Sequence, residues 1–463
     1  MIGVPAPIPA RLRSSQYLGY AAGEVANNLT FQMVAVFLLI YYTDVAGISA
    51  STAGTVLLVV RIWGGFTDLL AGRRVDETMT RWGRFRPYLL FGSIPLLILL
   101  VGTFSVPGGL GGTTTLVWAF VSYALFSLAY SFVNIPYGSL AASMTQDPDE
   151  RARLSSARSV AASVTILLIA VVVAPQLQGS ADLQRSLTVT TAVFAAVGLG
   201  LYLWCFASAR EAVSPADHAV GARETMTMIR HNRPLVLLCS ATLLFLTGMF
   251  SLSAVAVFYA RDVLGNADLY IVMTALQTAA MVAAAAAVPW AVAIVGKRRA
   301  YVLAGSIAAV AALGFALAPG SVPAAGIACY GVLGIGFGAI NALIFALQAD
   351  TVEYGEWNSG VRAEGASYAV LSFTRKTGQG IGGAAAAYTI GIGGYVSGAA
   401  SQTDSAVASI KIAAGVVPAV AIAAAVAVML VYPLTETVFR GVVADLAERH
   451  ADRAPSPPAV AGV

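Results

Sequence analysis

Apolar and polar residues alternate in long blocks along the chain, and the apolar blocks have the length of membrane-spanning helices. About 20 consecutive apolar residues are needed to cross the hydrocarbon core of a bilayer. Twelve runs meet this condition: 17–45, 52–71, 88–106, 114–142, 158–178, 186–208, 233–260, 268–295, 301–319, 322–349, 366–395 and 410–434. The pattern therefore predicts an all-α integral membrane protein with twelve transmembrane helices.

The connections between these spans differ in charge from one side of the membrane to the other. Those after odd-numbered spans, such as "AGISAS", are short and nearly free of Lys and Arg, whereas those after even-numbered spans, such as "GRRVDETMTRWGRFRP", are basic. Basic connections are retained on the cytoplasmic side. We therefore expect both termini in the cytoplasm and the protein in a bacterial-type inner membrane.

The longest connection separates two sets of six spans. The predicted organisation is an N-terminal six-helix bundle over 1–208, a cytoplasmic linker over 209–232, a C-terminal six-helix bundle over 233–434 and a disordered cytoplasmic tail over 435–463. This arrangement resembles the major facilitator superfamily, in which two bundles rock around a central site.

Composition supports the membrane assignment and narrows the chemistry. Of the 463 residues 58% are hydrophobic and 11% charged, about half the charge of a soluble protein. The three histidines lie in polar segments and no CxxC pair occurs, so neither a metal site nor an organic cofactor is expected. The lack of histidine in the spans also disfavours an intramembrane enzyme. The linker and tail are too short for a sensor's signalling domain, and nothing predicts a nucleic-acid partner.

The second span carries ionisable residues that lipid does not tolerate without a reason. Arg61, Gly64, Gly65 and Asp68 share one helix face. Seven residues rise about 10.5 Å along a helix, which is too far for Arg61 and Asp68 to pair directly. Asp68 must therefore find another helix's donor, water, a proton or a cation. An intramembrane acid is a functional candidate by default.

Two other spans have polar stripes that predict a cavity wall. The first span contributes Tyr20, Glu24, Asn27 and Asn28, and the fourth contributes Tyr130, Asn134 and Tyr137. An aromatic ring beside an amide suits a sugar, which needs an apolar face and paired hydrogen bonds. The alternative for the first span is that its polar residues are simply hydrated near the cytoplasmic mouth.

Two cations stand next to each other in the eleventh span. Arg375 and Lys376 point about 100° apart on a helix. We expect one to face the cavity and the other to face a neighbouring helix or the lipid headgroups.

A cytoplasmic gate is a further expectation. The tenth span ends in "ADTVEYGE", whose acids could pair with the arginines of "TRWGRFRP" and "DERARLSSAR", although solvated loop charge is an equal alternative. The candidate gate residues are Asp76, Arg84, Arg151, Asp350, Glu353 and Glu356.

Six short segments of the sequence together resemble a known family. "YYTDVAGIS", "RIW…D", "RWGRFRPYLL", "NIPYGSL", "ADTVEYGE" and "TRKTGQ" occur in the order and spacing of the glycoside–pentoside–hexuronide:cation symporters, over nearly the whole chain. Segments such as "GEVANN" and "SFTRKTGQGIGG" resemble its glucuronide permeases more than its melibiose permeases. The resemblance implies a twelve-helix, alternating-access symporter with a sugar site between the halves, generally a monomer.

The same resemblance implies roles for individual residues. Asp68 matches a family acid of the cation site, and Thr67 and Ser131 match positions lining it. Tyr130 and Asn134 match sugar-site positions, while Arg158 and Lys376 match basic residues near the sugar site or its cytoplasmic gate. Arg61, on the face of Asp68, is expected to influence how tightly Asp68 holds a proton.

Departures from the sodium-using melibiose permeases suggest the coupling ion and the sugar. Gly64 replaces a second acid one turn before Asp68, which favours a proton over sodium because a proton needs only one tunable carboxylate. Asn27 and Asn28 replace a lysine–aspartate pair, and Asn134 and Asn341 replace an aspartate and a tryptophan. A less acidic cavity with Arg158 and Lys376 suits an anionic hexuronide such as a β-glucuronide. Pentoside or xyloside transport, a neutral galactoside and uniport remain open.

Overall fold

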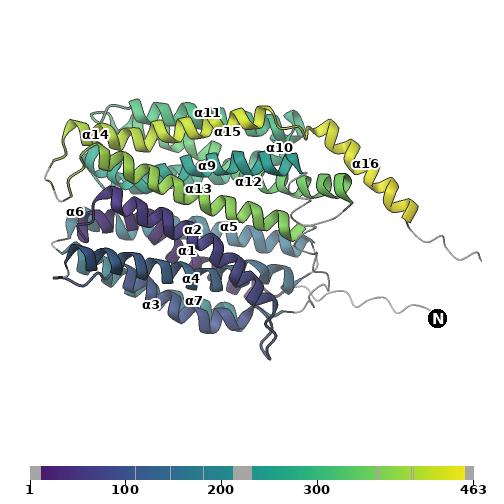
Figure 1. Cartoon of the computed structure of the whole chain (residues 1–463), viewed down its shortest axis with the longest axis horizontal. Helices are drawn as coiled ribbons and strands as arrows, with labels where there is room; N and C mark the ends of the chain where they lie inside the picture. The colour runs from purple at the N-terminus through teal and green to yellow at the C-terminus, as the bar shows by residue number, and fades with distance from the viewer. Residues whose placement is uncertain are drawn as a thin grey trace, which may run out of the picture.

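The protein is built of long, roughly parallel helices arranged in two layers (Figure 1). The computed structural model describes residues 12–109, 111–145, 148–180, 182–211, 232–360, 364–397, 399 and 401–453. The first-half elements are α1 (Ser14–Ile40), η1 (Tyr41–Val45), α2 (Ala50–Asp76), η2 (Tyr88–Gly92), α3 (Ser93–Thr103), α4 (Gly112–Met144), α5 (Pro148–Val173), α6 (Gln176–Gly179) and α7 (Leu183–Ser208). The second-half elements are α9 (Arg233–Phe258), η3 (Tyr259–Val263), α10 (Leu269–Val295), α11 (Lys297–Leu317), α12 (Pro323–Ser359), α13 (Glu364–Ile392), α14 (Asp404–Lys411), η4 (Ile412–Val416), α15 (Val417–Leu430) and α16 (Glu436–Arg453).

These helices confirm the predicted spans. Within the described residues ten helices are long and apolar enough to cross a membrane. The two remaining predicted runs are also helical. The run 88–106 contains η2 and α3, which together form a shorter apolar helix, and the run 366–395 contains most of α13. Most of the predicted linker, residues 212–231, lies outside the described residues, so its conformation stays a prediction.

Local side chains fix where several helices begin. The carboxylate of Asp182 accepts the backbone N–H of Arg185 at 2.9 Å at the start of α7. Asn232 accepts the N–H of Leu235 at 3.1 Å at the start of α9. Each cap satisfies a donor that the first turn of a helix leaves unpaired.

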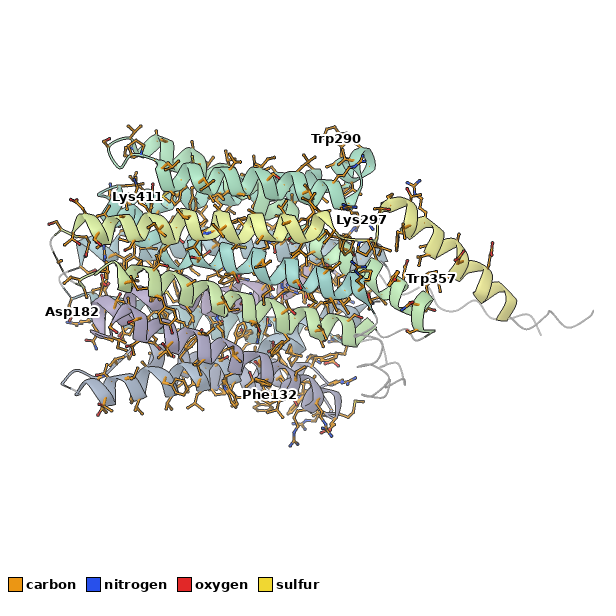
Figure 2. The ribbon with its side chains drawn as sticks, turned by 45° about the horizontal axis from the view of Figure 1, so that its top comes forward. Phe132, Asp182, Trp290, Lys297, Trp357 and Lys411 are labelled. Carbon is orange, nitrogen blue, oxygen red and sulfur yellow. The ribbon has the colours of Figure 1, made fainter. Side chains whose placement is uncertain are left out.

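The two ends of the bundle can be told apart by the chain termini. The C-terminal helix α16 lies at one end, here called the terminal end, while α6 and α14 lie at the other, the distal end (Figure 1). Lys297 and Trp357 mark the terminal end, and Asp182 and Lys411 mark the distal end (Figure 2).

The C-terminal segment departs from the predicted disorder. Glu436–Arg453 form α16, so the expected disordered tail over 435–463 is wrong for these residues. Val442 and Leu446 share a face and are buried, at 4% and 8% exposure. Apolar residues four positions apart lie on one face of a helix, and burial of that face stabilises the helix. Residues 454–463 lie outside the described part.

The halves meet along α2 and α13, which pack closely because glycines line the contact. A side chain at Gly380 would place its Cβ 2.7 Å from the Cβ of Arg61, and one at Gly65 would lie 2.7 Å from the ring of Phe373. Small residues let helix backbones approach in a membrane. This close contact brings the ionisable residues of α2 within reach of α13.

Candidate substrate and cation site

An ion pair joins the two halves in the middle of α2 and α13. Lys376 Nζ lies 2.5 Å from Asp68 Oδ2 and also donates to the carbonyl oxygen of Gly64 at 3.1 Å. Both side chains are largely buried, at 16% and 10% exposure. The second carboxylate oxygen, Oδ1, is buried without a hydrogen-bond partner. Of the two adjacent cations, Lys376 is therefore the one that faces α2.

Two hydroxyl groups lie beside this pair. Thr67, next to Asp68 on α2, and Ser131 on α4 have their hydroxyl oxygens 2.8 Å apart. Both are almost completely buried, and each also lies within hydrogen-bond distance of a carbonyl oxygen of its own helix, that of Gly64 at 3.0 Å for Thr67 and that of Ser127 at 3.1 Å for Ser131. The structure thus brings together two side chains that the sequence grouped in one cation site.

A second ion pair lies within the first half. Arg158 on α5 donates to Glu24 on α1 at 2.7 Å, and the amide of Asn28 donates to the other oxygen of the same carboxylate at 2.9 Å. The central carbon of the guanidinium also lies over the ring of Tyr137, 5.5 Å from the ring centre. Glu24, Asn28 and Arg158 therefore form one connected cluster.

Asn27 departs from that stripe. Its amide oxygen accepts the hydroxyl of Tyr202 on α7 at 2.7 Å, and the side chain is only 2% exposed. The expectation that Asn27 and Asn28 share the cavity wall is wrong, because neighbours on a helix point about 100° apart. Asn28 contacts Glu24 of its own helix, whereas Asn27 contacts Tyr202 of α7.

A small cavity opens beside the Asp68–Lys376 pair. It encloses about 30 Å³ and is lined by the rings of Phe31, Tyr123, Phe126 and Tyr130 and by the cations Arg61 and Lys376. Pockets for drug-sized ligands span about 300–1,000 Å³, so a glycoside requires the helices to move apart. Aromatic faces and charge are nevertheless gathered at one place.

The described residues that line this cavity do not include Asn134 or Asn341, two asparagines predicted for the sugar site. Tyr130 donates to Asn134 at 3.4 Å on the same helix. Asn341 on α12 donates to the carbonyl of Phe337 at 3.0 Å and contacts the sulfur of Met249 at 3.8 Å. Asn341 thus lies against α9 in this structure.

Arg375 takes a different direction from Lys376. Its guanidinium lies 5.0 Å from the centre of the Phe345 ring on α12, and its Nη1 is buried without a hydrogen-bond partner. This outcome confirms that the two cations face different neighbours.

The acids of the predicted cytoplasmic gate behave differently from the expectation. Asp350 pairs with Lys297 of the same half at 2.7 Å, so the predicted pairing with first-half arginines is wrong for this residue. Lys297 begins the neighbouring α11 and reaches Asp350 without crossing between halves. Arg84 Nε donates to the carbonyl of Val75, also within its own half.

The remaining gate candidates are less informative. Glu353 and Glu356 are half-buried. The side chains of Asp76 and Arg151 lie outside the described part of the structure.

A network that the sequence reading missed joins the halves at the distal end. Arg261 donates to Asp44 across the halves at 2.7 Å and to Asp262 at 2.9 Å. Tyr395 donates to Asp44 at 3.0 Å and accepts from Arg261 at 2.5 Å. With exposures of 14% and 7%, the Arg261–Asp44 pair is largely buried.

A repeat in the sequence could have revealed this network. "YYTDVAG" at 41–47 and "YARDVLG" at 259–265 end the first span of each half. Both form π-helical segments, η1 and η3, followed by glycines with φ of 67° and 75°. The equivalent acids of the two repeats, Asp44 and Asp262, both contact Arg261.

Comparison with known proteins places these features in a family. The profile of the family described as "MFS/sugar transport protein" matches residues 19–436. The chain is 40% identical to the glucuronide carrier protein homolog of Escherichia coli (strain K12), covering 93% of this chain and 95% of that protein. It is 32% identical to the isoprimeverose transporter of Lactiplantibacillus pentosus, covering 94% and 92%.

The fold has solved counterparts as well. The crystal structure of the nucleoside transporter NupG superposes with a TM-score of 0.65 over 91% of this chain and 100% of that one, at 15% identity. At this identity the likeness concerns the fold alone. Together with the sequence matches, it shows a multi-pass membrane transporter that is a sugar symporter. The chain belongs to the glycoside–pentoside–hexuronide:cation symporter family of the major facilitator superfamily.

Proposed function

We propose that this symporter carries a hexuronide glycoside, most simply a β-glucuronide, together with one proton. The observation that carries the proposal is the Asp68–Lys376 pair, a single carboxylate bound to a cation of the opposite half beside the cavity. A proton on Asp68 removes the negative partner of Lys376. Proton binding then changes both the contact between the halves and the charge of the cavity.

Charge in the interior supports an anionic substrate. Four cations lie inside the predicted spans, namely Arg61, Arg158, Arg375 and Lys376. Two acids, Glu24 and Asp68, compensate two of them. An excess of positive charge in a low-dielectric site favours an anion. The 40% identity to a protein named as a glucuronide carrier homolog agrees with this substrate class.

Coupling follows from the same charges. An ionised Asp68 repels a substrate carboxylate and occupies Lys376, whereas a protonated Asp68 does neither. Proton and hexuronide therefore each strengthen the binding of the other, as linkage requires. A sodium ion is less suited to this site because Gly64 supplies no second carboxylate.

The distal network supports alternating access. Asp44, Arg261 and Tyr395 hold the halves together at the end opposite the termini. If both termini are cytoplasmic in a bacterial-type inner membrane, as the basic connections favour, this is the outward side. In the proposed cycle the contacts of the distal network break, and the sugar then enters from this side. The transporter works as a monomer, and its two halves move around a central site that stays fixed.

The likeness to the isoprimeverose transporter favours a second candidate, a different glycoside carried by the same site. One measurement separates the two. A β-glucuronide is added to lightly buffered, sodium-free, de-energised cells that express the protein, and external pH is recorded. Transient alkalinisation supports proton–glucuronide symport. Labelled glucuronide that enters without a pH change points to uniport or another cation, and no uptake points to the second candidate.

A further inference from the structure

The cations beside the cavity differ in whether an acid already neutralises them. Lys376 is paired with Asp68, and Arg158 is paired with Glu24. Arg61 lines the cavity, yet no acid in the described part of the chain lies within ion-pair distance of it. It donates a hydrogen bond to a neutral amide, the oxygen of Gln379, at 3.2 Å.

Aromatic faces hold this guanidinium in place of a counter-charge. Its central carbon lies 5.0 Å from the ring centre of Phe31 on α1 and 6.0 Å from that of Phe250 on α9. Rings of both halves thus contact the group. Cation–π contacts stabilise an arginine only partly, so the positive charge stays available to an anion.

We propose that Arg61 recognises the carboxylate of the substrate and so selects hexuronides over neutral glycosides. The inference rests on the proposed function and names the residue that reads the acid group. Arginine is the side chain best shaped for this task because its N–H groups bind both oxygens of a carboxylate at once. Lys376 stays committed to Asp68 until a proton arrives.

The surroundings of Arg61 suit the rest of such a ligand. Phe126 and Tyr130 stack on one another with ring centres 6.1 Å apart, and Phe31 stacks on Tyr130 at 5.8 Å. These rings line the same cavity as Arg61. A pyranose whose carboxylate is held by Arg61 would place its ring against this aromatic wall.

The test compares two probes that differ only at carbon 6. Uptake of 4-nitrophenyl β-D-glucuronide and of 4-nitrophenyl β-D-glucoside is measured in proteoliposomes for the wild type, Arg61→Gln and Arg61→Lys. The matched control is Arg375→Gln. Like Arg61, Arg375 is a cation inside a span that pairs with no acid among the described residues, but its guanidinium lies over the ring of Phe345 and not in the cavity. Loss of a charged hydrogen bond predicts that Arg61→Gln lowers the glucuronide-to-glucoside ratio about 10- to 150-fold.

The outcomes distinguish this inference from the proposed function. A fall in the ratio through weaker glucuronide uptake, partly rescued in Arg61→Lys and absent in Arg375→Gln, supports the role of Arg61. An unchanged ratio in Arg61→Gln, or equal loss of both probes from a folded protein, overturns it while hexuronide transport stands. A wild type without preference for the glucuronide overturns the proposed substrate class itself.

Discussion

Replacing Asp68 with asparagine is expected to separate sugar movement from proton movement. The amide keeps the shape of the side chain but can neither ionise nor pair with Lys376. Uphill uptake should be lost, because no proton is bound and released during the cycle. Exchange of labelled for unlabelled glucuronide should persist, because it needs only reorientation of the loaded carrier.

The size of the effect on binding can be worked from the position of Asp68. It lies seven residues from Arg61 on α2, hence about 10.5 Å along the helix axis. At an effective dielectric constant of about 20, an ionised Asp68 opposes a carboxylate held at Arg61 by about 1.6 kcal/mol, or about 15-fold in affinity. A wild type with an ionised Asp68 should therefore bind glucuronide about 15-fold more weakly than Asp68→Asn.

Asp68→Asn should keep the higher affinity for glucuronide at every pH, because its amide cannot ionise. Binding is measured as the concentration of glucuronide that half-protects the purified protein or half-saturates exchange, between pH 5.5 and 8.5. The control is Asp404→Asn, which removes an exposed acid at the start of α14, far from the cavity. Uphill accumulation that survives in Asp68→Asn, or a pH dependence like that of the wild type, would refute the assignment of Asp68.

Three other predictions follow from the geometry. Gly64→Asp should make uptake respond to sodium, because it adds a second carboxylate on the helix face of Asp68. The side chain can be accommodated, because its Cβ would lie 3.8 Å from Lys376 Nζ and would press only on the rotatable Ser127 hydroxyl. Equal uptake in choline and in sodium, or the same sodium response in Gly64→Asn, would contradict this. Asp44→Asn should weaken the distal closure by up to about 3–5 kcal/mol, because it breaks a largely buried pair. A cysteine placed at Ala50, which is buried at 6% exposure at the distal start of α2, serves as the reporter. Faster labelling of this cysteine by an impermeant maleimide than in Asp404→Asn checks the prediction, and equal rates argue against a gate. A proton and a monoanionic hexuronide move no net charge, so a potassium–valinomycin potential should not drive accumulation, whereas about 50-fold uptake per 100 mV would indicate one net charge.

The order of apolar and polar blocks determined much of the protein without any structure. Membrane spans follow from the sequence because lipid cannot satisfy a backbone that is not helical, so about 20 apolar residues have one solution. The shared face of Arg61 and Asp68 is equally a property of the helix period. The family motifs then pointed to a sugar symporter, which the comparisons confirm.

Only the packing of the halves decided which neighbours these residues meet. A helix period fixes the angle between Arg375 and Lys376 but not the rotation of α13, so the partner Asp68 became visible only in three dimensions. Packing likewise decided that Asn27 contacts Tyr202 of α7, and that Asp350 pairs with Lys297 of its own half instead of with the first half. The Asp44–Arg261 pair joins residues 217 positions apart. The repeat at 41–47 and 259–265 marks these positions, but the contact itself depends on how the two bundles meet.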